Sequence, residues 1–404
     1  MKWRFLVSVA AMLVLGLATV WWVRGVQTIE QDGTCPLYLM WRDDPTTTMT
    51  VSWLCDRADA PPPAVFYRAA DEAAWQLAPG TSEPFPHTDW TLHRVELAGL
   101  RAGTLHHFIV AGEGRVHSFR TLPETLERPV RFVQGGDVGK DFEVMDNVNR
   151  LAASRDPDFA VWGGDLAYCD GKPEKARRWW RFFQSVHRHL RTPDGRLVPL
   201  VVAPGNHEVH KENGRADCYL ALFPAKSGRT YGALDAGDYL SLLLLDTGHL
   251  ADIAGEQSAW LEDALAEREG RPHILPVYHK GAYPSVRDFD GSSAGAIREH
   301  WVPLFEEHGV GLAFEHHDHT YKVTHPLRRG TIDPSGVVYA GDGAWGVGTR
   351  EVKSDRPYLR QAAGVHHFHE VILEPQARHL QSVAADGTVM DALRQEVSGN
   401  GRPL

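Results

Sequence analysis

The pattern of apolar and polar residues changes near Pro123, and this change predicts two domains. Before it, residues 35–124 consist of short segments, most of which alternate apolar and polar positions between clusters of turn-forming residues. Alternation with a period of two is typical of strands that bury one face. We expect such strands at 38–41, 49–54, 64–67, 92–97 and 107–110. This part is therefore predicted to be an all-β sandwich of the immunoglobulin or fibronectin type III kind, whose simplest role is to position the second domain.

After Pro123, apolar strands alternate with segments of helical spacing, which is typical of a layered α/β domain. We expect this domain over residues 128–395, with two β-sheets flanked by helices, in an α+β-like layered arrangement. The expected strands are 130–134, 159–162, 200–203, 239–245, 274–277, 310–314 and 367–373. The expected helices are 142–154, 174–190, 257–269 and 296–308, and a hairpin is expected around Asp386-Gly387.

The first 27 residues differ from both domains. Residues 5–23 form an uncharged run of 19 residues between Lys2 and Arg4 on one side and Arg24 on the other. That length can just cross a bilayer as a helix, and Trp21-Trp22 at its end suits a membrane interface. We expect 1–27 to be a retained membrane anchor, with a cleaved signal peptide as the alternative. Both place the remaining chain outside the cytoplasm, either anchored in the periplasmic or extracellular space or secreted.

Composition narrows the class of partner. The 404 residues are 43% hydrophobic and 23% charged, as in ordinary globular proteins. A formal net charge of −10, without a run of Lys and Arg, argues against a nucleic-acid partner.

Four cysteines agree with an oxidising compartment, where Cys35 with Cys55 and Cys169 with Cys218 would form two disulfides. Buried unpaired thiols are the alternative.

Five stretches that each follow an apolar strand carry oxygen and imidazole donors. They are Gly136-Asp137-Val138-Gly139, Gly164-Asp165-Leu166-Ala167-Tyr168, Gly205-Asn206-His207-Glu208, Val277-Tyr278-His279 and His316-His317-Asp318-His319. Sites in open α/β sheets lie at the carboxyl ends of strands. Taken alone, an Asp after two glycines or a Gly-Asn-His is often only a turn. The ordered set of five predicts a site for two metal ions, with Asp165 as the best candidate to bridge them.

In this order, the five stretches resemble the motif set of the purple acid phosphatases, a subset of the calcineurin-like metallophosphoesterases: GDxG, GDxxY, GNH(E/D), VxxH and GHxH. The resemblance covers residues 128–345 and departs from the set in two places. Val277 stands one position closer to His279 than in the motif, and His316 replaces the glycine of the fifth motif. The sandwich, with its strand Met49-Thr-Val-Ser-Trp, also resembles the domain that precedes the catalytic domain in larger members.

The resemblance implies the distribution of the ligands over two metals. One metal would be bound by Asp137, Asp165, Tyr168 and His319, and the other by Asp165, Asn206, His279 and His317. A tyrosine, whose ordinary pKa is near 10, is a poor ligand for a divalent ion at neutral pH, whereas a trivalent ion can displace its proton. The first set therefore suits Fe(III), and the second suits a divalent Zn, Mn or Fe.

The implied reaction is hydrolysis of a small phosphate monoester by metal-bound hydroxide, without a covalent enzyme intermediate. The resemblance assigns His207 to the substrate phosphate and to the leaving group, where it would donate a proton, and we expect Glu208 to orient it. Asn206, His316, Lys280 and Tyr283 are further candidates for substrate binding. Histidines 187, 189, 366, 367 and 369 are expected to be packing or surface residues.

Two other functions remain open at this point. The same core can serve a phosphodiesterase or nucleotide pyrophosphatase, and the loops at 209–236 and 280–295 must set the room beside the leaving group. A membrane-tethered binding protein with a degenerate site is a third possibility, although all seven ligand positions are intact. The oligomeric state cannot be predicted from the sequence.

Overall fold

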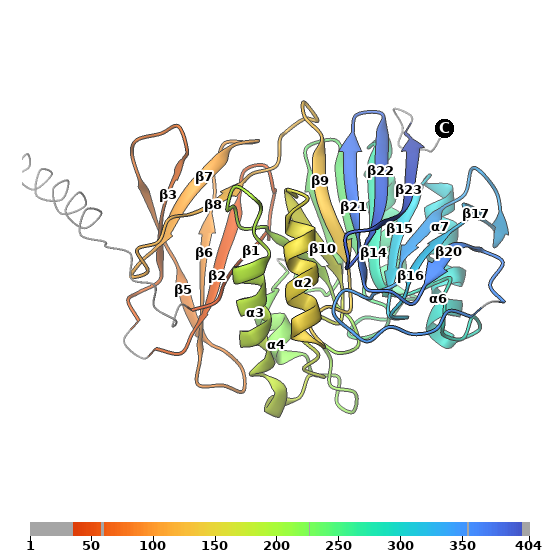
Figure 1. Cartoon of the computed structure of the whole chain (residues 1–404), viewed down its shortest axis with the longest axis horizontal. Coiled ribbons are helices and arrows are strands. Elements are labelled where there is room, and N and C mark those ends of the chain that lie inside the picture. Colours follow the sequence, from red (N-terminus) through yellow and green to blue (C-terminus); the bar gives the residue numbers. More distant parts are fainter. Residues whose placement is uncertain (1–34, 58–59, 226, 354, 398–404) are drawn as a thin grey trace, which may run out of the picture.

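The structure, a computed structural model, describes residues 35–57, 60–225, 227–353 and 355–397 (Figure 1). The amino-terminal segment 1–27 lies outside these residues, so its role as an anchor or signal stays a prediction. Within the described ranges, no helix combines the length and the apolar character that crossing a membrane would need.

The amino-terminal part is the β-sandwich that the alternation predicted. Strands β4 (Gln76–Pro79), β3 (Ala64–Ala69), β7 (Leu105–Val110) and β8 (His117–Arg120) form one antiparallel sheet in that order. The facing strands are β1 (Leu37–Met40), β2 (Met49–Cys55), β6 (Thr91–Leu97) and β5 (Thr81–Pro84). Every residue of β2 is buried, because this strand lies inside the sandwich.

The sandwich shares a sheet with the second domain. Strand β1 pairs in parallel with β11 (Leu200–Ala203), with Met40 opposite Leu200, so one ten-stranded sheet runs through both domains. Tyr38 of β1 also stacks on Phe183 with ring centroids 4.0 Å apart, and its hydroxyl donates to the carbonyl of Leu222. The amino-terminal domain is thus joined to its neighbour by backbone pairing and by buried aromatic contacts, which the sequence pattern did not predict.

The second domain has two sheets. Its share of the long sheet contains β9 (Val130–Gly135), β10 (Phe159–Gly163), β11, β21 (His367–Glu374), β22 (Ala377–Ala384) and β23 (Val389–Glu396). The other sheet has the order β12 (Gly232–Ala236), β13 (Leu240–Leu244), β14 (His273–Lys280), β15 (Leu312–His316), β19 (Val338–Gly341), β16 (Tyr321–Thr324) and β20 (Leu359–Ala363). A short hairpin of β17 (Leu327–Arg328) and β18 (Thr331–Ile332) lies outside both.

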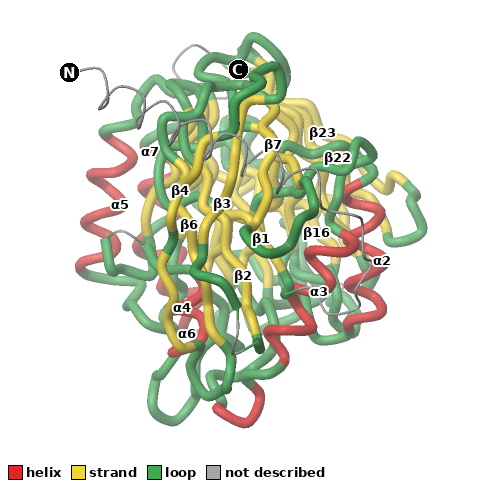
Figure 2. Tube along the Cα trace, turned by 90° about the vertical axis from the view of Figure 1, so that its left-hand side faces the viewer, coloured by secondary structure: helices red, strands yellow, loops and turns green. Residues whose placement is uncertain are grey.

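Helices cover the outer faces of the two sheets (Figures 1 and 2). Helices α2 (Phe142–Ala153), α3 (Arg178–His189) and α4 (Asp217–Leu222) pack on the long sheet, and α5 (Glu256–Ala266), α6 (Ser292–His300) and α7 (Val302–Glu307) pack on the other. The largest apolar cluster lies between the sheets, where Phe132 contacts Phe314 edge-on. Strands between two apolar layers are buried on both faces, which explains why several of them are continuous apolar runs.

Two expected helices are shorter than the periodicity indicated. The segment expected at 174–190 begins with a separate 3-10 turn, η1 (Pro173–Lys175), before α3 starts at Arg178. The segment expected at 296–308 is divided at Trp301, because Pro303 lacks the amide hydrogen that a continuous helix would need and instead stands in the first turn of α7. The hairpin around Gly387 is confirmed between β22 and β23.

The structure holds all four cysteines as free thiols, so the two expected disulfides are not formed in it. Burial raises the pKa of Cys35 and of Cys218 to about 12, and it raises the pKa of Cys169 well above the ordinary value. A buried, protonated thiol is a weak nucleophile.

Candidate metal centre

The five predicted strand ends meet at one place between the two sheets. Asp137, Asp165 and Asn206 follow β9, β10 and β11, which are parallel neighbours in the long sheet. His279 lies near the end of β14, and His317 directly follows β15 in the facing sheet. Parallel neighbours end at the same edge of their sheet, and the packing of one sheet on the other brings the two edges together.

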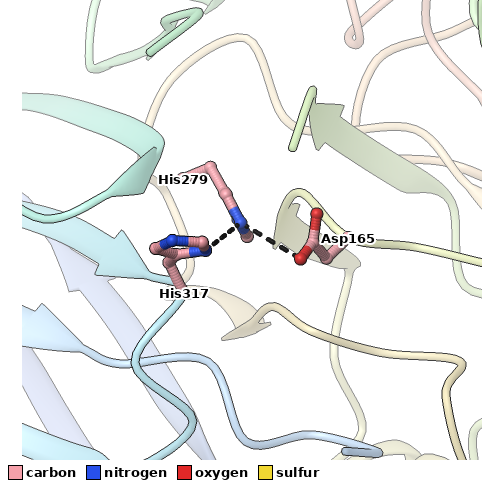
Figure 3. Close-up of side chains that lie close together, drawn as sticks. All are labelled: Asp165, His279 and His317. Atoms are coloured by element: carbon pink, nitrogen blue, oxygen red, sulfur yellow. Dashed lines mark hydrogen bonds and ion pairs between the residues drawn. The ribbon is translucent and has the colours of Figure 1, made fainter. Parts of the chain in front are cut away.

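One group of side chains contains Asp165, Asn206, His279 and His317. The Nε2 atom of His279 lies 3.2 Å from Oδ2 of Asp165, 3.2 Å from Oδ1 of Asn206 and 3.0 Å from Nδ1 of His317. Figure 3 shows Asp165, His279 and His317 turned toward one another, and one ligand atom from each lies within 4.8 Å of the others. The Oδ2 atom of Asp165 is buried and has no hydrogen-bond partner. This orphaned carboxylate oxygen, facing imidazole nitrogens, fits a metal ion.

Hydrogen bonds fix the orientation of these ligands. The Nδ1 atom of His279 lies 2.9 Å from the carbonyl oxygen of Gly163, so Nδ1–H donates there and Nε2 faces the group. Burial lowers the pKa of His279, but the carboxylate of Asp165 outweighs burial and raises it to about 9. Burial and the neighbouring His279 lower the pKa of His317, which is therefore neutral. A bound cation would compete only with the proton on His279.

The other group contains Asp137, Tyr168 and His319. The Tyr168 hydroxyl donates to Oδ1 of Asp137 over 3.1 Å, and Nε2 of His319 lies 3.0 Å from the same oxygen. The second oxygen of Asp137 accepts the backbone N–H of His317 over 2.9 Å. Burial and the charge of Asp137 raise the pKa of Tyr168 well above 10. The phenol therefore keeps its proton unless a strongly polarising cation replaces it.

Asp165 lies near both groups. It contacts His279 directly, and its charge also contributes to the raised pKa of Tyr168. Its Oδ1 atom accepts the backbone N–H of His207 over 2.8 Å, which leaves Oδ2 for the interior of the site. This position suits the bridging role that the sequence predicted for it.

The backbone of the site is unusually rich in left-handed conformations. Nine described residues other than glycine have a positive φ, and six of them belong to this site: Asp137, Asp165, Tyr168, Asp170, His317 and His319. Such conformations cost free energy and persist where the surrounding structure imposes them. Their concentration here indicates that the fold places these side chains at the expense of local stability.

His316 does not line the pocket, in contrast to its expected role in substrate binding. It is fully buried, and its Nδ1–H donates to the carbonyl of Tyr278 over 2.7 Å while its Nε2 faces the amide of Gln134. Burial lowers its pKa to about 3, so it is a neutral packing residue. A Cβ atom at Gly163 or Gly136 would lie 1.9 or 2.5 Å from this ring. Gly163 and Gly136, which lack side chains, therefore leave the space that the His316 ring occupies.

The expected contact between His207 and Glu208 is replaced by another pair. Glu208 is buried and accepts three backbone N–H groups, from Asp165, Leu166 and Gly205, over 2.7 to 2.8 Å. It braces the loops that carry the ligands, and burial together with Asp165 raises its pKa to about 8. The Nδ1 atom of His207 instead pairs with Oδ1 of Asp170, and the other ring nitrogen faces the site, 3.8 Å from Oδ2 of Asp165.

The remaining candidates lie at different depths. Tyr283 is buried in the apolar cluster beneath α5, α6 and α7, where its ring contacts Tyr339 and Tyr358. Lys280 is half-buried, and its Nζ donates to Ser293 over 3.2 Å. Of the histidines expected to pack, His187, His367 and His369 are buried.

Sequence reasoning missed three residues beside the site: Asp170, His249 and Arg287. Asp170 follows Tyr168 by two positions and could have been found as the nearest carboxylate after the second motif. His249 ends Asp246-Thr247-Gly248-His249, a sixth strand end of the same composition, and its ring centroid lies 5.7 Å from that of His279. Arg287 donates from its guanidinium to the carbonyl of His317, and no motif signals this contact.

Comparison with known proteins agrees with the two-domain arrangement. Residues 34–121 match the family model "Purple acid Phosphatase, N-terminal domain", and residues 130–321 match "Calcineurin-like phosphoesterase". Purple acid phosphatase 15 of Arabidopsis thaliana is 25% identical over 299 residues, which cover 64% of this chain and 54% of that protein. Uncharacterized protein Rv2577 of Mycobacterium tuberculosis is 25% identical over 362 residues, or 76% of this chain and 65% of that protein. The chain thus spans less than two thirds of either relative.

A solved structure shares the fold. The purple acid phosphatase PPD1 from yellow lupin (Lupinus luteus) seeds superimposes with a TM-score of 0.75 at 17% identity, covering 89% of this chain and 73% of the lupin chain. The layered architecture with its amino-terminal sandwich is therefore a known one. At this identity the likeness concerns the fold alone.

Proposed function

We propose that this chain hydrolyses phosphate monoesters at a dinuclear metal site. The chain belongs to the purple acid phosphatase-like calcineurin-like phosphoesterases, and it carries a purple acid phosphatase N-terminal domain ahead of its catalytic domain. The observation that carries the proposal is the buried Oδ2 atom of Asp165. It has no hydrogen-bond partner and faces His279 and His317, whose nitrogens are held for a metal ion. The charge of Asp165 is balanced by the proton on His279, whose Nε2 lies 3.2 Å away, and a bound metal ion would take the place of that proton.

Two metals in this site would clamp the phosphate and supply a nucleophile at neutral pH. The residues of the chain would divide between them by donor type. Asp137, Tyr168 and His319, with Asp165, form the oxygen-rich set, which suits a trivalent ion such as Fe(III). Asn206, His279 and His317, with Asp165, form the nitrogen-richer set, which suits a divalent Zn, Mn or Fe.

In this proposal, His207 donates a proton to the leaving group. Asp170 accepts from Nδ1–H, so the proton that can be given away is on Nε2, which faces the site. Burial raises the pKa of Asp170, but hydrogen bonds from Lys175 and His207 outweigh it and hold the pKa below its ordinary value. Asp170 is therefore a carboxylate at neutral pH, which fixes the tautomer of His207 and the angle of its ring. The side chain of His207 is 33% exposed, so a substrate can reach it.

The test is made on the purified full chain. Elemental analysis and the visible spectrum would be recorded first, followed by the hydrolysis of p-nitrophenyl phosphate and of bis(p-nitrophenyl) phosphate. We expect two metals per chain, one of them iron, a charge-transfer band from tyrosinate, and faster hydrolysis of the monoester. Tyr168→Phe should remove the band, whereas the matched variant Tyr67→Phe, on a strand of the sandwich, should keep it.

Other results would redirect the proposal. A colourless protein with two divalent ions would remove Tyr168 as a ligand of Fe(III) while keeping the hydrolase. Faster cleavage of the diester would favour the phosphodiesterase alternative. A metal-loaded protein that cleaves neither compound would contradict the proposal and favour a binding protein.

A further inference from the structure

The turn formed by residues 246–251, which follows β13, lies against the candidate ligand His279 and has no role in the chemistry described above. The centroid of the His249 ring lies 5.7 Å from that of His279, with the two ring planes inclined at 60°. His279 points toward both Asp165 and His317 (Figure 3). A side chain that packs on the His279 ring therefore bears on how this ligand is held.

A buried carboxylate fixes the backbone of the 246–251 turn. Asp246 is fully buried, and its Oδ1 atom accepts the backbone N–H of His249 over 2.7 Å. Its Oδ2 atom accepts the N–H groups of Leu250 and Ala251 over 3.0 and 3.1 Å. The hydroxyl of Thr230 also donates to Oδ2, over 2.7 Å. Hydrogen bonds to a charged acceptor are the strong ones, so the position of His249 is set by the fold.

Thr247 joins His249 to the backbone beside the ligand. Its Oγ1 atom accepts the backbone N–H of Lys280, the residue after His279, over 3.2 Å. The same Oγ1 atom lies 3.0 Å from Nε2 of His249, and the hydroxyl has its own proton to donate there. This hydrogen bond fixes the plane of the His249 ring.

These contacts form a closed ring around His279. The ring runs along the chain from His279 to Lys280, through hydrogen bonds to Thr247 and then to His249, and back to His279 by the contact between the two imidazoles. The Nδ1–H of His279 is held separately by the carbonyl of Gly163. A side chain restrained both at its Nδ1 atom and on its ring has little rotamer freedom to lose when it binds a metal ion.

We infer that His249 is a positioning residue for His279, and that the 246–251 turn holds the His279 imidazole in the orientation that binds the divalent ion. This inference rests on the proposed function, because it takes His279 as a metal ligand. His249 lies outside both ligand sets, so it acts on the metal through His279. Groups that orient a metal ligand change metal affinity or activity by about 10- to 100-fold when they are removed.

Titration with Zn²⁺ tests this inference on the purified full chain. The divalent ion is first removed with a mild chelator, and Zn²⁺ is then added in competition with a chelating indicator to obtain Kd. We expect His249→Ala to raise this Kd about tenfold or more, because the ring of His279 then loses its support. His249→Phe keeps an aromatic ring against His279, so its Kd should stay within about threefold of the wild-type value.

Thr247→Val tests the hydrogen-bonded part of the ring of contacts, since it keeps the shape of the side chain and removes the hydroxyl. Its Kd should rise by less than that of His249→Ala. The double variant should raise Kd by less than the product of the two single increases, because both residues belong to one chain of contacts. Thermal unfolding in the presence of chelator monitors the fold of each variant, and Thr247→Val carries the test if His249→Ala does not fold.

His379→Ala is the matched control, because this half-buried histidine of β22 pairs with Glu374 and should keep the wild-type Kd. Wild-type Kd values in both His249→Ala and Thr247→Val would overturn the inference. So would a Phe variant as weak as the Ala variant, because the contact between the rings would then have no effect. An unchanged Kd with a raised KM for p-nitrophenyl phosphate would also overturn it, since His249 would then act on the substrate.

The Kd for Zn²⁺ is measured without hydrolysis, so a failure of this inference can be told from a failure of the proposed function. A wild type that binds Zn²⁺, loses affinity in His249→Ala and cleaves no ester would refute the phosphatase proposal alone. A wild type that hydrolyses the monoester and keeps its Kd in His249→Ala and Thr247→Val would refute the positioning role alone.

Discussion

The two halves of the candidate metal centre differ in whether their polar atoms all have hydrogen-bond partners within the protein. Around Asp137, each polar atom has a partner within the protein, since Tyr168, His319 and the N–H of His317 all contact its carboxylate. Around Asp165, one carboxylate oxygen is buried with no hydrogen bond. In the first half, Tyr168 keeps its phenol proton and donates it to Asp137, and a cation must displace that proton to bind Tyr168. In the second half, a cation has to displace only the proton of His279, whose pKa is about 9, and His317 is already neutral, so a weaker Lewis acid suffices.

This difference gives a physical reason for two unlike metals in one site. An ion that displaces a phenol proton from a buried tyrosine must polarise its ligands strongly, as a trivalent ion does. A divalent ion displaces a proton more easily from an imidazole than from a phenol, and His279 is already oriented by its hydrogen bond to Gly163. The two halves share Asp165, so a change there should affect both.

The largest effect is expected from Asp165→Asn, because both halves of the centre share this carboxylate and both should lose their metal ion. The amide cannot supply the bridging charge, so activity against p-nitrophenyl phosphate should fall on the order of 10³-fold or more, as for loss of several kcal/mol of charge stabilisation. Metal content, measured by elemental analysis, should fall below one ion per chain. Asp141→Asn, at the exposed start of α2, is the control and should retain both metals and activity. Retention of two metals by Asp165→Asn would contradict a bridging role.

Removing a ligand from only one half should reduce activity less than Asp165→Asn does. Tyr168→Phe should lose the visible band and the ion of the first half, and His317→Gln should lose the divalent ion of the second. Each change should reduce activity about 10- to 100-fold by weakening one site, the scale known for altered metal sites. Elemental analysis with a spectrum distinguishes the two variants. If both variants lost the same ion, the assignment of ligands to halves would be wrong.

Asp170→Asn should test proton donation by His207 without removing a metal ligand from either half. The amide cannot hold the Nδ1 proton as a carboxylate does, so protonation of the leaving group suffers by about tenfold or more. The loss should be larger for glycerol 3-phosphate, whose alkoxide leaves poorly, than for p-nitrophenyl phosphate. The metal content should stay at the wild-type value. An equal loss for both substrates would contradict assistance to the leaving group.

The smallest effect concerns the support of the second half by His316. Gly163→Ala places a methyl group 1.9 Å from the His316 ring, and overpacking of this kind costs about 1 to 3 kcal/mol of stability. Denaturant unfolding should show this loss in the single variant. Adding His316→Gly should recover a large part of it by removing the clash. Without such recovery, His316 would not be the group that requires glycine at position 163.

The sequence predicted the fold class, and the strand-end residues that it named are ones that the structure brings close together, because their signal is local. Gly, Asp, Asn and His at strand ends need only the strand and the turn that follows, and both are encoded within a few residues. The division of the helix at Trp301 was also readable in principle from Pro303, but the helical spacing around it masked the break. The pairing of β1 with β11 was not readable, because the residues of a strand do not specify which distant strand will pair with it.

What the sequence determined by itself is the composition of the site and the order of its ligands along the chain. Only the tertiary structure decided the surroundings of each side chain. His316 is buried because residues 136 and 163 have no side chains, and Glu208 turns to three backbone amides while Asp170 takes the contact with His207. Arg287 reaches the site through Asp318, 31 residues further along the chain. Such contacts join residues that are distant in sequence, and their free energies depend on packing and burial that no local pattern encodes.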